Sequence, residues 1–220
     1  MSIIQPEEIK VHTAGIGLSG DLALPQDATG IVIFAHGSGS SRLSPRNRRV
    51  AAELQKKGLA TLLLDLLTPE EEARDIQTAA LRFDIDLLAP RLIAAMHLMR
   101  ERVKLPIGFF GASTGAAIAL VAAAHHPDDV AAVVSRGGRP DLAMSVLPKV
   151  RAATLLIVGG RDTQVIQMNR QAYDHLECEK RMEIVPGATH LFEEPGALEQ
   201  VAALAGNWFV AHLIRTPVVA

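Results

Sequence analysis

The sequence predicts an α/β protein in which a mostly parallel central sheet is covered by helices on both faces. Apolar runs of strand length alternate with longer segments of helical periodicity, the pattern of parallel strands joined by crossover helices. Several of these runs end in glycine- or serine-rich turns, such as HGSGS after the run at 31–37. The length of 220 residues suits one domain over 1–220.

The predicted elements follow the chain in order. The strands are two antiparallel edge strands within 8–25, then 31–37, 60–67, 105–110, 130–135, 153–158 and 181–185. The helices are 47–57, 76–103 with Pro90 as a point where it could break, 116–124 and 193–214, while 69–75 is an exposed connection or a short helix start. The interval between 135 and 153 is too short for an inserted lid, so no large cap domain and a fairly open site are expected.

Composition and charge exclude several classes of protein. Hydrophobic residues make up 49% of the chain and charged residues 21%, which is typical of a globular domain. The net charge of −2 gives no indication of a nucleic-acid partner. The basic stretch at 42–49 could contact an anion, but it fits the start of a helix with a solvated face better.

Targeting and redox signals are absent from the sequence pattern. Cys178 is the single cysteine, so no intrachain disulfide is expected. The N-terminus lacks the pattern of a secretory signal, and no uncharged apolar run reaches about 18 residues. The sequence thus predicts a cytoplasmic protein without a membrane partner, and it carries no signal for an oligomeric state.

A candidate nucleophile lies in the sequence Gly111-Ala112-Ser113-Thr114-Gly115. This pattern matches the G-x-S-x-G elbow, in which a serine sits on a strained turn between a strand and a helix. The context supports the motif, because IGFF before it is strand-like and AAIALVAAA after it is helix-like. Gly111 and Gly115 would let the strand and helix backbones approach each other.

A serine hydroxyl needs a positioned base. Of the eight histidines, His190 alone lies in a turn after the last predicted strand, where such a base belongs. Asp162 follows the preceding strand and completes the chain order Ser, Asp, His. Rival carboxylates are Asp141, expected to cap a short helix, and Glu193 or Glu194, expected to open the last helix.

The developing oxyanion would need two backbone amides. Thr114 N–H follows the nucleophile, and Ser38 N–H in the loop after 31–37 is the favoured second donor, with Gly39 as its alternative. Near this site His36, Arg136 and Arg139 are candidate substrate-binding residues, although the arginines fit loop-stabilising ion pairs better. No sequence motif of a metal site or nucleotide-binding loop occurs, so no cofactor is expected.

The order HGSGS, GASTG, GGRD and GATH, each at the end of a strand, resembles the α/β-hydrolase superfamily. The short chain without a cap is most similar to its dienelactone-hydrolase-like branch. That resemblance implies the α/β-hydrolase fold and a Ser113, His190, Asp162 triad. Dienelactone hydrolases proper have a cysteine nucleophile, so the serine here favours a serine esterase over dienelactone hydrolysis itself.

The sequence therefore predicts a serine hydrolase that cleaves small or short-chain carboxylic esters or lactones through an acyl-enzyme. The same residues are compatible with a thioesterase, amidase, perhydrolase or acyltransferase. A ligand-binding module with a vestigial triad is the alternative from another class, because a fold does not determine a function.

Overall fold

The computed structural model describes residues 5–213, and its centre is an eight-stranded sheet in the order β1-β2-β4-β3-β5-β6-β7-β8. The strands are β1 (Glu7–Thr13), β2 (Ile16–Ala23), β3 (Gly30–Ala35), β4 (Leu59–Leu64), β5 (Ile107–Ala112), β6 (Val130–Arg136), β7 (Ala153–Gly159) and β8 (Lys180–Val185). β1 and β2 form an antiparallel edge, and β3 to β8 are mutually parallel. The predicted strands and their mostly parallel arrangement are confirmed.

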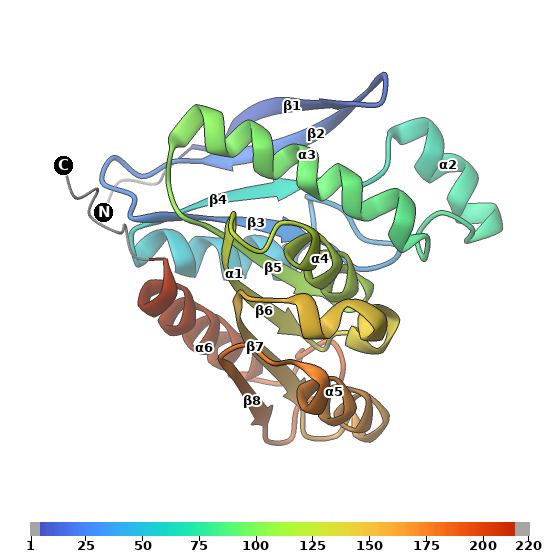
Figure 1. Ribbon diagram of the computed structural model, residues 1–220, viewed down its shortest axis with the longest axis vertical. Helices are drawn as coiled ribbons and strands as arrows, with labels where there is room; N and C mark the ends of the chain where they lie inside the picture. Colours follow the sequence, from blue (N-terminus) through green and yellow to red (C-terminus); the bar gives the residue numbers. More distant parts are fainter. Residues whose placement is uncertain (1–4, 214–220) are drawn as a thin grey trace.

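Helices cover both faces of the sheet (Figure 1). One face carries α1 (Pro45–Lys56) and α6 (Ala197–His212), and the other carries α3 (Ile85–Val103), α4 (Thr114–His125), the 3₁₀ helix η1 (Pro140–Lys149) and α5 (Thr163–His175). The short helix α2 (Pro69–Thr78) lies beyond the carboxyl end of β4 (Figure 1). η1 fills the interval between β6 and β7, where the sequence left no room for a lid.

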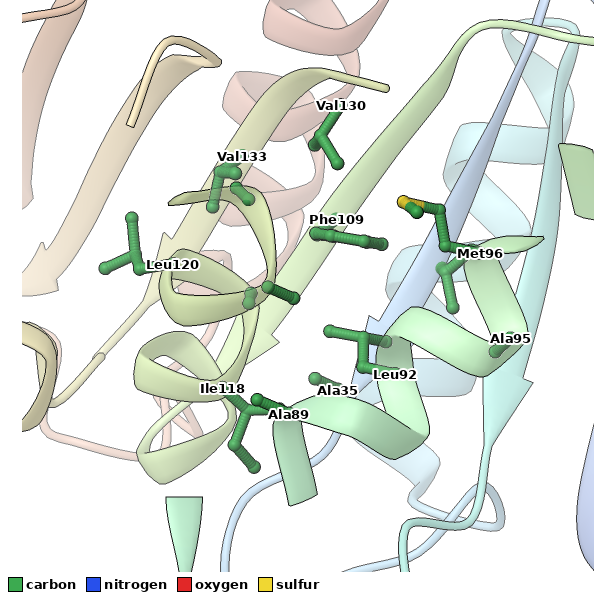
Figure 2. Packing of buried hydrophobic residues seen from close by; sticks show 14 of the residues in the cluster. Ala35, Ala89, Leu92, Ala95, Met96, Phe109, Ile118, Leu120, Val130 and Val133 are labelled. Atoms are coloured by element: carbon green, nitrogen blue, oxygen red, sulfur yellow. The ribbon is translucent and has the colours of Figure 1, made fainter. Parts of the chain in front are cut away.

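Each face of the sheet has its own apolar core, because side chains alternate along a strand. Phe109 belongs to the core under α3 and α4, whereas its neighbour Phe110 belongs to the core under α1 and α6. Figure 2 shows Leu92 and Met96 of α3 facing Phe109. On the other face Phe34 and Phe110 stack with ring centroids 4.8 Å apart. Burial on both faces holds the parallel strands in place.

The helix predicted over 76–103 is wrong in one respect, because the chain forms two helices there. Ala79 takes a left-handed conformation with φ 54° and ends α2, and Asp84 accepts a hydrogen bond from Leu87 N–H at 2.9 Å as the N-cap of α3. Pro90 lies inside α3 and does not break it. A proline near the start of a helix leaves most of the later hydrogen bonds intact.

The last helix was also predicted too long. It begins at Ala197, after Gly196 with φ 81°, so Glu193 and Glu194 belong to the preceding loop and do not open the helix. Residue 214, its predicted end, lies outside the described residues. η1 occupies the interval where a short helix was expected around Asp141, but α5 was not predicted.

Leu66, just after β4, joins several elements that shape the carboxyl edge of the sheet. Its carbonyl accepts a hydrogen bond from the buried Arg91 of α3 at 2.7 Å. Arg91 also forms a two-point ion pair with Glu71 of α2, at 2.6 and 2.7 Å. The Arg91 guanidinium lowers the pKa of the Glu71 carboxyl. This network sets α2 against the start of α3.

The amide of Leu66 fixes the glycine-rich loop after β3. It donates to Nε2 of His36 at 3.1 Å, and the other ring nitrogen, Nδ1, lies 2.9 Å from the Gly37 carbonyl. An amide can only donate, so Nε2 carries no proton and His36 is neutral. Burial lowers the pKa of His36 below 6.5, although the Asp65 and Glu72 carboxylates favour its protonated form.

This arrangement makes stability sensitive to acid. The pKa of His36 in the folded chain lies below the unfolded value of 6.5. The contribution of neutral His36 to the free energy of unfolding is therefore complete above that pH. This contribution is lost as the pH falls, because the unfolded chain then binds more protons than the folded chain. The free energy of unfolding, measured in urea at about pH 7.5 and about pH 5, should fall less for His36→Gln than for the wild type. The exposed His125 is the control, and His125→Gln should keep the wild-type pH dependence. Equal pH dependence in His36→Gln and the wild type would contradict the neutral, bonded state of His36.

Candidate active site

Ser113 sits on a strained turn between β5 and α4. Its backbone has φ 52° and ψ −120°, a region that costs a non-glycine residue about 1–3 kcal/mol. The predicted reason for the flanking glycines is confirmed. A Cβ at Gly111 would lie 2.4 Å from Cα of Ala116, and one at Gly115 would lie 2.1 Å from the carbonyl oxygen of Ala35. The backbones of β5, α4 and β3 therefore meet without side chains between them.

The structure brings Ser113, His190 and Asp162 together at the carboxyl edge of the sheet. Nδ1 of His190 lies 2.6 Å from Oδ2 of Asp162, and Nε2 of His190 lies 3.3 Å from Oγ of Ser113. Asp162 holds the N-cap position of α5, yet its side chain makes no capping hydrogen bond. Its carboxylate faces the imidazole instead. The three residues follow β5, β7 and β8, as the sequence order predicted.

Close backbone contacts hold the histidine loop against the aspartate loop. Arg161 N–H donates to the carbonyl of Ala188 at 2.9 Å. A Cβ at Gly159 would lie 2.5 Å from the same carbonyl oxygen, and one at Gly137 would lie 3.2 Å from the carbonyl of His190. No role for these glycines was expected from the sequence. The signal was present as two Gly-Gly pairs, at 137–138 and 159–160, each at the end of a strand.

The rival carboxylates have other partners. Asp141 forms a two-point ion pair with Arg139 at 2.9 and 2.8 Å. It lies in the first turn of η1, where no side-chain cap occurs, so the expected capping role is wrong. Glu193 pairs with Arg46 at 3.1 Å. Glu194 accepts a hydrogen bond from Thr189 N–H at 3.0 Å, and its pKa is lowered chiefly by hydrogen bonding with the side chain of Thr189.

The loop after β3 packs directly against the serine. A Cβ at Gly37 would lie 3.1 Å from Cβ of Ser113 and 3.0 Å from the carbonyl oxygen of Ala112. Ser38 N–H donates to Oγ1 of Thr114 at 2.9 Å, so this amide reaches the elbow but has an acceptor in the structure. Thr114 N–H is the first amide of α4, one of the donors that a helix cannot satisfy internally.

A pocket of about 290 Å³ opens beside this loop. Its apolar lining comes from Leu66, Leu67, Ile76, Leu88 and Ile118, and its polar lining includes Ser38, Ser40, Ser41, Asp65, Glu72, Asp75 and Arg82. His36 also lines it, but both of its ring nitrogens are already hydrogen bonded.

The charges on the pocket lining are mostly paired. Asp65 pairs with Arg42 at 2.8 Å, and Asp75 pairs with Arg82 at 2.6 Å. Glu72 forms no ion pair with any residue of the described chain. The lining therefore carries one uncompensated negative charge.

The two candidate arginines do not line this pocket. The side chain of Arg139 is held by Asp141, as the ion-pair interpretation expected. Arg136 ends β6, is only 7% exposed and forms no ion pair with the described residues, so the ion-pair interpretation is wrong for it. Its carbonyl accepts a hydrogen bond from Ser113 N–H at 3.1 Å, which ties its backbone to the elbow.

Other kinds of site find little support within residues 5–213. No group of three or more histidine, cysteine, aspartate or glutamate side chains is arranged there to hold a metal ion. None of the helices described combines the length and apolar character needed to cross a bilayer.

Two curated proteins of Mycobacterium tuberculosis strains, both provisionally named phosphoribosyl transferases, are 54% identical to the chain over 213 residues. The match covers 96% of this chain but 47% of theirs, so the chain spans about half the length of these relatives.

Solved structures resemble the fold over nearly its whole length. A crystal structure of a dienelactone hydrolase from Anabaena variabilis is 58% identical, with a TM-score of 0.92, and the match covers 95% of this chain and 99% of that one. Est1E from Butyrivibrio proteoclasticus matches at 15% identity with a TM-score of 0.78, covering 93% and 98% of the two chains. An esterase of Pyrococcus furiosus matches at 17% identity with a TM-score of 0.75, covering 96% and 92%.

The last two likenesses show a common α/β-hydrolase fold and no more. The family comparison goes further, because the model of the dienelactone hydrolase family matches residues 18–210, which include all three side chains at the carboxyl edge. The chain belongs to the dienelactone hydrolase family.

Proposed function

We propose that the chain hydrolyses small carboxylic esters or lactones through an acyl-enzyme formed on Ser113. The observation that carries this proposal is the hydrogen-bonded series from Asp162 through His190 to Ser113, at 2.6 and 3.3 Å. A nucleophile, a base and a group that orients the base form the constellation that acyl transfer needs. Membership of a family of hydrolases supports the same reaction class.

His190 acts first as a base and then as an acid. With Asp162 accepting a hydrogen bond from Nδ1–H, the free Nε2 faces Ser113 and takes its proton as Oγ attacks the ester carbonyl. The protonated imidazole then gives its proton to the leaving alkoxide, and the neutral imidazole that remains later takes a proton from the water that attacks the acyl-enzyme and releases the acid. The distance of 3.3 Å to Oγ is somewhat long, and such contacts tighten when substrate binds.

The oxyanion is held by backbone amides. Thr114 N–H has no intrahelical partner and lies one residue after the nucleophile. Ser38 N–H already points at the elbow through its bond to Oγ1 of Thr114, so substrate must replace that hydroxyl as its acceptor. A hydroxyl is a weaker acceptor than a developing oxyanion, which favours the exchange. Gly39 is the alternative second donor.

The pocket beside the loop supports small substrates. Its volume of about 290 Å³ lies at the lower end of the range for small-molecule sites. One structure of Est1E holds ferulic acid, a small carboxylic acid, on the same fold. We assign the pocket to the group beside the reacting carbonyl, with apolar contacts from Leu66, Leu88 and Ile118 and hydroxyls from Ser40 and Ser41.

The first prediction concerns the nucleophile. Ser113→Ala should lower kcat for a p-nitrophenyl ester on the order of 10⁴-fold, and Ser113→Ala/His190→Ala should be hardly worse, because the two act as one unit. A fluorophosphonate probe should label the wild type and not Ser113→Ala. Retention of about a tenth of the wild-type rate, or labelling of the alanine variant, would place the nucleophile elsewhere.

The second prediction separates two carboxylates. Asp162→Asn should lower kcat severely, by roughly 10⁴-fold on the precedent of serine proteases, because an amide no longer fixes the productive imidazole tautomer. Asp141→Asn is the matched control, since it loses only its ion pair with Arg139, and its kcat should stay within about threefold of wild type. A larger loss in Asp141→Asn than in Asp162→Asn would contradict the assignment.

The third prediction tests the pocket charge. Glu72 should disfavour substrates that carry a carboxylate near the ester, by ~1 kcal/mol or about fivefold in kcat/KM. A pair of esters that differ only in a terminal carboxylate or carboxamide measures this preference. Glu72→Gln should reduce the preference for the neutral ester about fivefold. Glu70→Gln, on the same helix but outside the pocket lining, should leave it unchanged. Equal preferences in all three proteins would show that the substrate does not occupy this pocket.

A further inference from the structure

Arg136, at the end of β6, is a buried cation without an acceptor in the part of the chain that the structure describes. Its exposed fraction is 7%. Both Nε and Nη1 are shielded from solvent and form no hydrogen bond with any residue in 5–213. A buried donor without an acceptor costs about 1–3 kcal/mol, and more when the group is charged. Burial, together with the positive charge of Arg46, lowers the pKa of Arg136 to about 10, so the side chain is still charged at neutral pH.

The side chain points toward the face of the sheet that α1 and α6 cover. Val134 and Ala132, the residues two and four positions before it, belong to the core on that face. The neighbouring cation confirms the direction, because Arg46 is the second residue of α1. Two arginines from distant parts of the chain therefore approach each other where β6 ends and α1 begins.

Arg46 leaves one donor free as well. Its Nη1 pairs with Glu193 at 3.1 Å, but its Nε is buried and has no acceptor among the described residues. Glu193 is largely exposed and compensates one of the two positive charges. Repulsion between guanidinium groups adds to the cost of burying Arg136. The positive end of the α1 dipole has the same sign, so the local field favours an anion.

The space beside Arg46 is accessible, although Arg136 does not line it. A pocket of about 300 Å³ is lined by Arg46, Arg49, Phe192 and Glu194, among others. Acidic side chains also line it, so a large polyanion does not suit this entrance. One oxygen of Glu194, Oε2, is buried without a donor. A small ligand that also carries a hydrogen-bond donor would satisfy that oxygen together with the arginines.

We propose that Arg136 and Arg46 form a binding site for one small oxyanion, a carboxylate or a phosphate monoester or inorganic phosphate. Such an anion accepts two hydrogen bonds from a guanidinium edge and offsets the unpaired charge. The site does not include Ser113, His190 or Asp162, and it does not depend on the proposed esterase reaction. It is coupled to the elbow through the backbone, because the Arg136 carbonyl accepts the Ser113 N–H.

The test is thermal unfolding of the full chain in sodium chloride, sodium phosphate or sodium acetate at equal ionic strength. With phosphate or acetate at about ten times its Kd, Tm of the wild type should rise by about 3 °C over the chloride value. A response to phosphate alone assigns the site to a phosphate group, and a response to acetate assigns it to a carboxylate. Titration calorimetry with the same anions gives the Kd.

Three arginine variants localise the effect. Arg136→Met and Arg46→Met should lose the rise in Tm and weaken the Kd at least about tenfold, the loss of a charge-assisted contact. Arg48→Met removes the same charge from a part of α1 outside the pocket lining, where Arg48 pairs with Asp21, and should respond like the wild type. Arg136→Met should also be at least as stable as the wild type in chloride, because it removes an unpaired buried charge.

Two outcomes overturn the proposal. One is a wild type whose Tm is the same in all three salts, which would mean that buried water alone satisfies Arg136. The other is a response to phosphate or acetate that survives in both Arg136→Met and Arg46→Met. If Arg136→Met does not fold, the partly exposed Arg46→Met decides by the same criteria. The Ser113→Ala variant should bind the anion like the wild type, which separates this result from any failure of the esterase proposal.

Discussion

The close backbone approach at the elbow is the constraint on which the rest of the site depends. Ser113 takes a strained backbone conformation only because β5, α4 and β3 meet through Gly111 and Gly115, where any Cβ would collide with backbone atoms. The strain of about 1–3 kcal/mol is offset by the two cores that clamp the sheet between helix layers. Rigid parallel strands then bring His190, after β8, within hydrogen-bond distance of Ser113, and Asp162, after β7, within hydrogen-bond distance of His190, although these residues are far apart in the sequence.

Most of the fold could be predicted because its signals are local. The parallel strands are buried on both faces and therefore appear as continuous apolar runs. α5 escaped prediction because its sequence is largely polar and only Val165, Asn169 and Ala172 are buried. The break before α3 also escaped, because a left-handed Ala79 gives no compositional signal and Pro90 suggested a different position.

The candidate site also has a part that the sequence predicts and a part that it does not. Strand order and turn composition were enough to single out Ser113, Asp162 and His190, because each follows a predicted strand. The orientation of side chains across distant loops was not accessible. The bond from Ser38 N–H to Oγ1 of Thr114 joins residues 76 positions apart. Arg136 likewise lacks an acceptor among the described residues because no carboxylate comes close to it in space, and no sequence pattern predicts such an absence.

The position of Leu66 has a consequence for how this architecture could change over time. The Leu66 amide donates to His36, in the loop after β3, and the Leu66 carbonyl accepts from Arg91. Leu66 therefore lies between the loop after β3 and the segment 68–84, which supplies Glu72, Asp75, Ile76 and Arg82 to the pocket lining. The proposed catalytic side chains, Ser113, Asp162 and His190, come from later in the chain. Insertions, deletions or exchanges within 68–84 can therefore diversify what the molecule accepts while the reactive apparatus stays intact. Part of the pocket lining and the proposed catalytic side chains therefore lie on separate stretches of the chain, which makes the segment 68–84 a natural place for laboratory evolution.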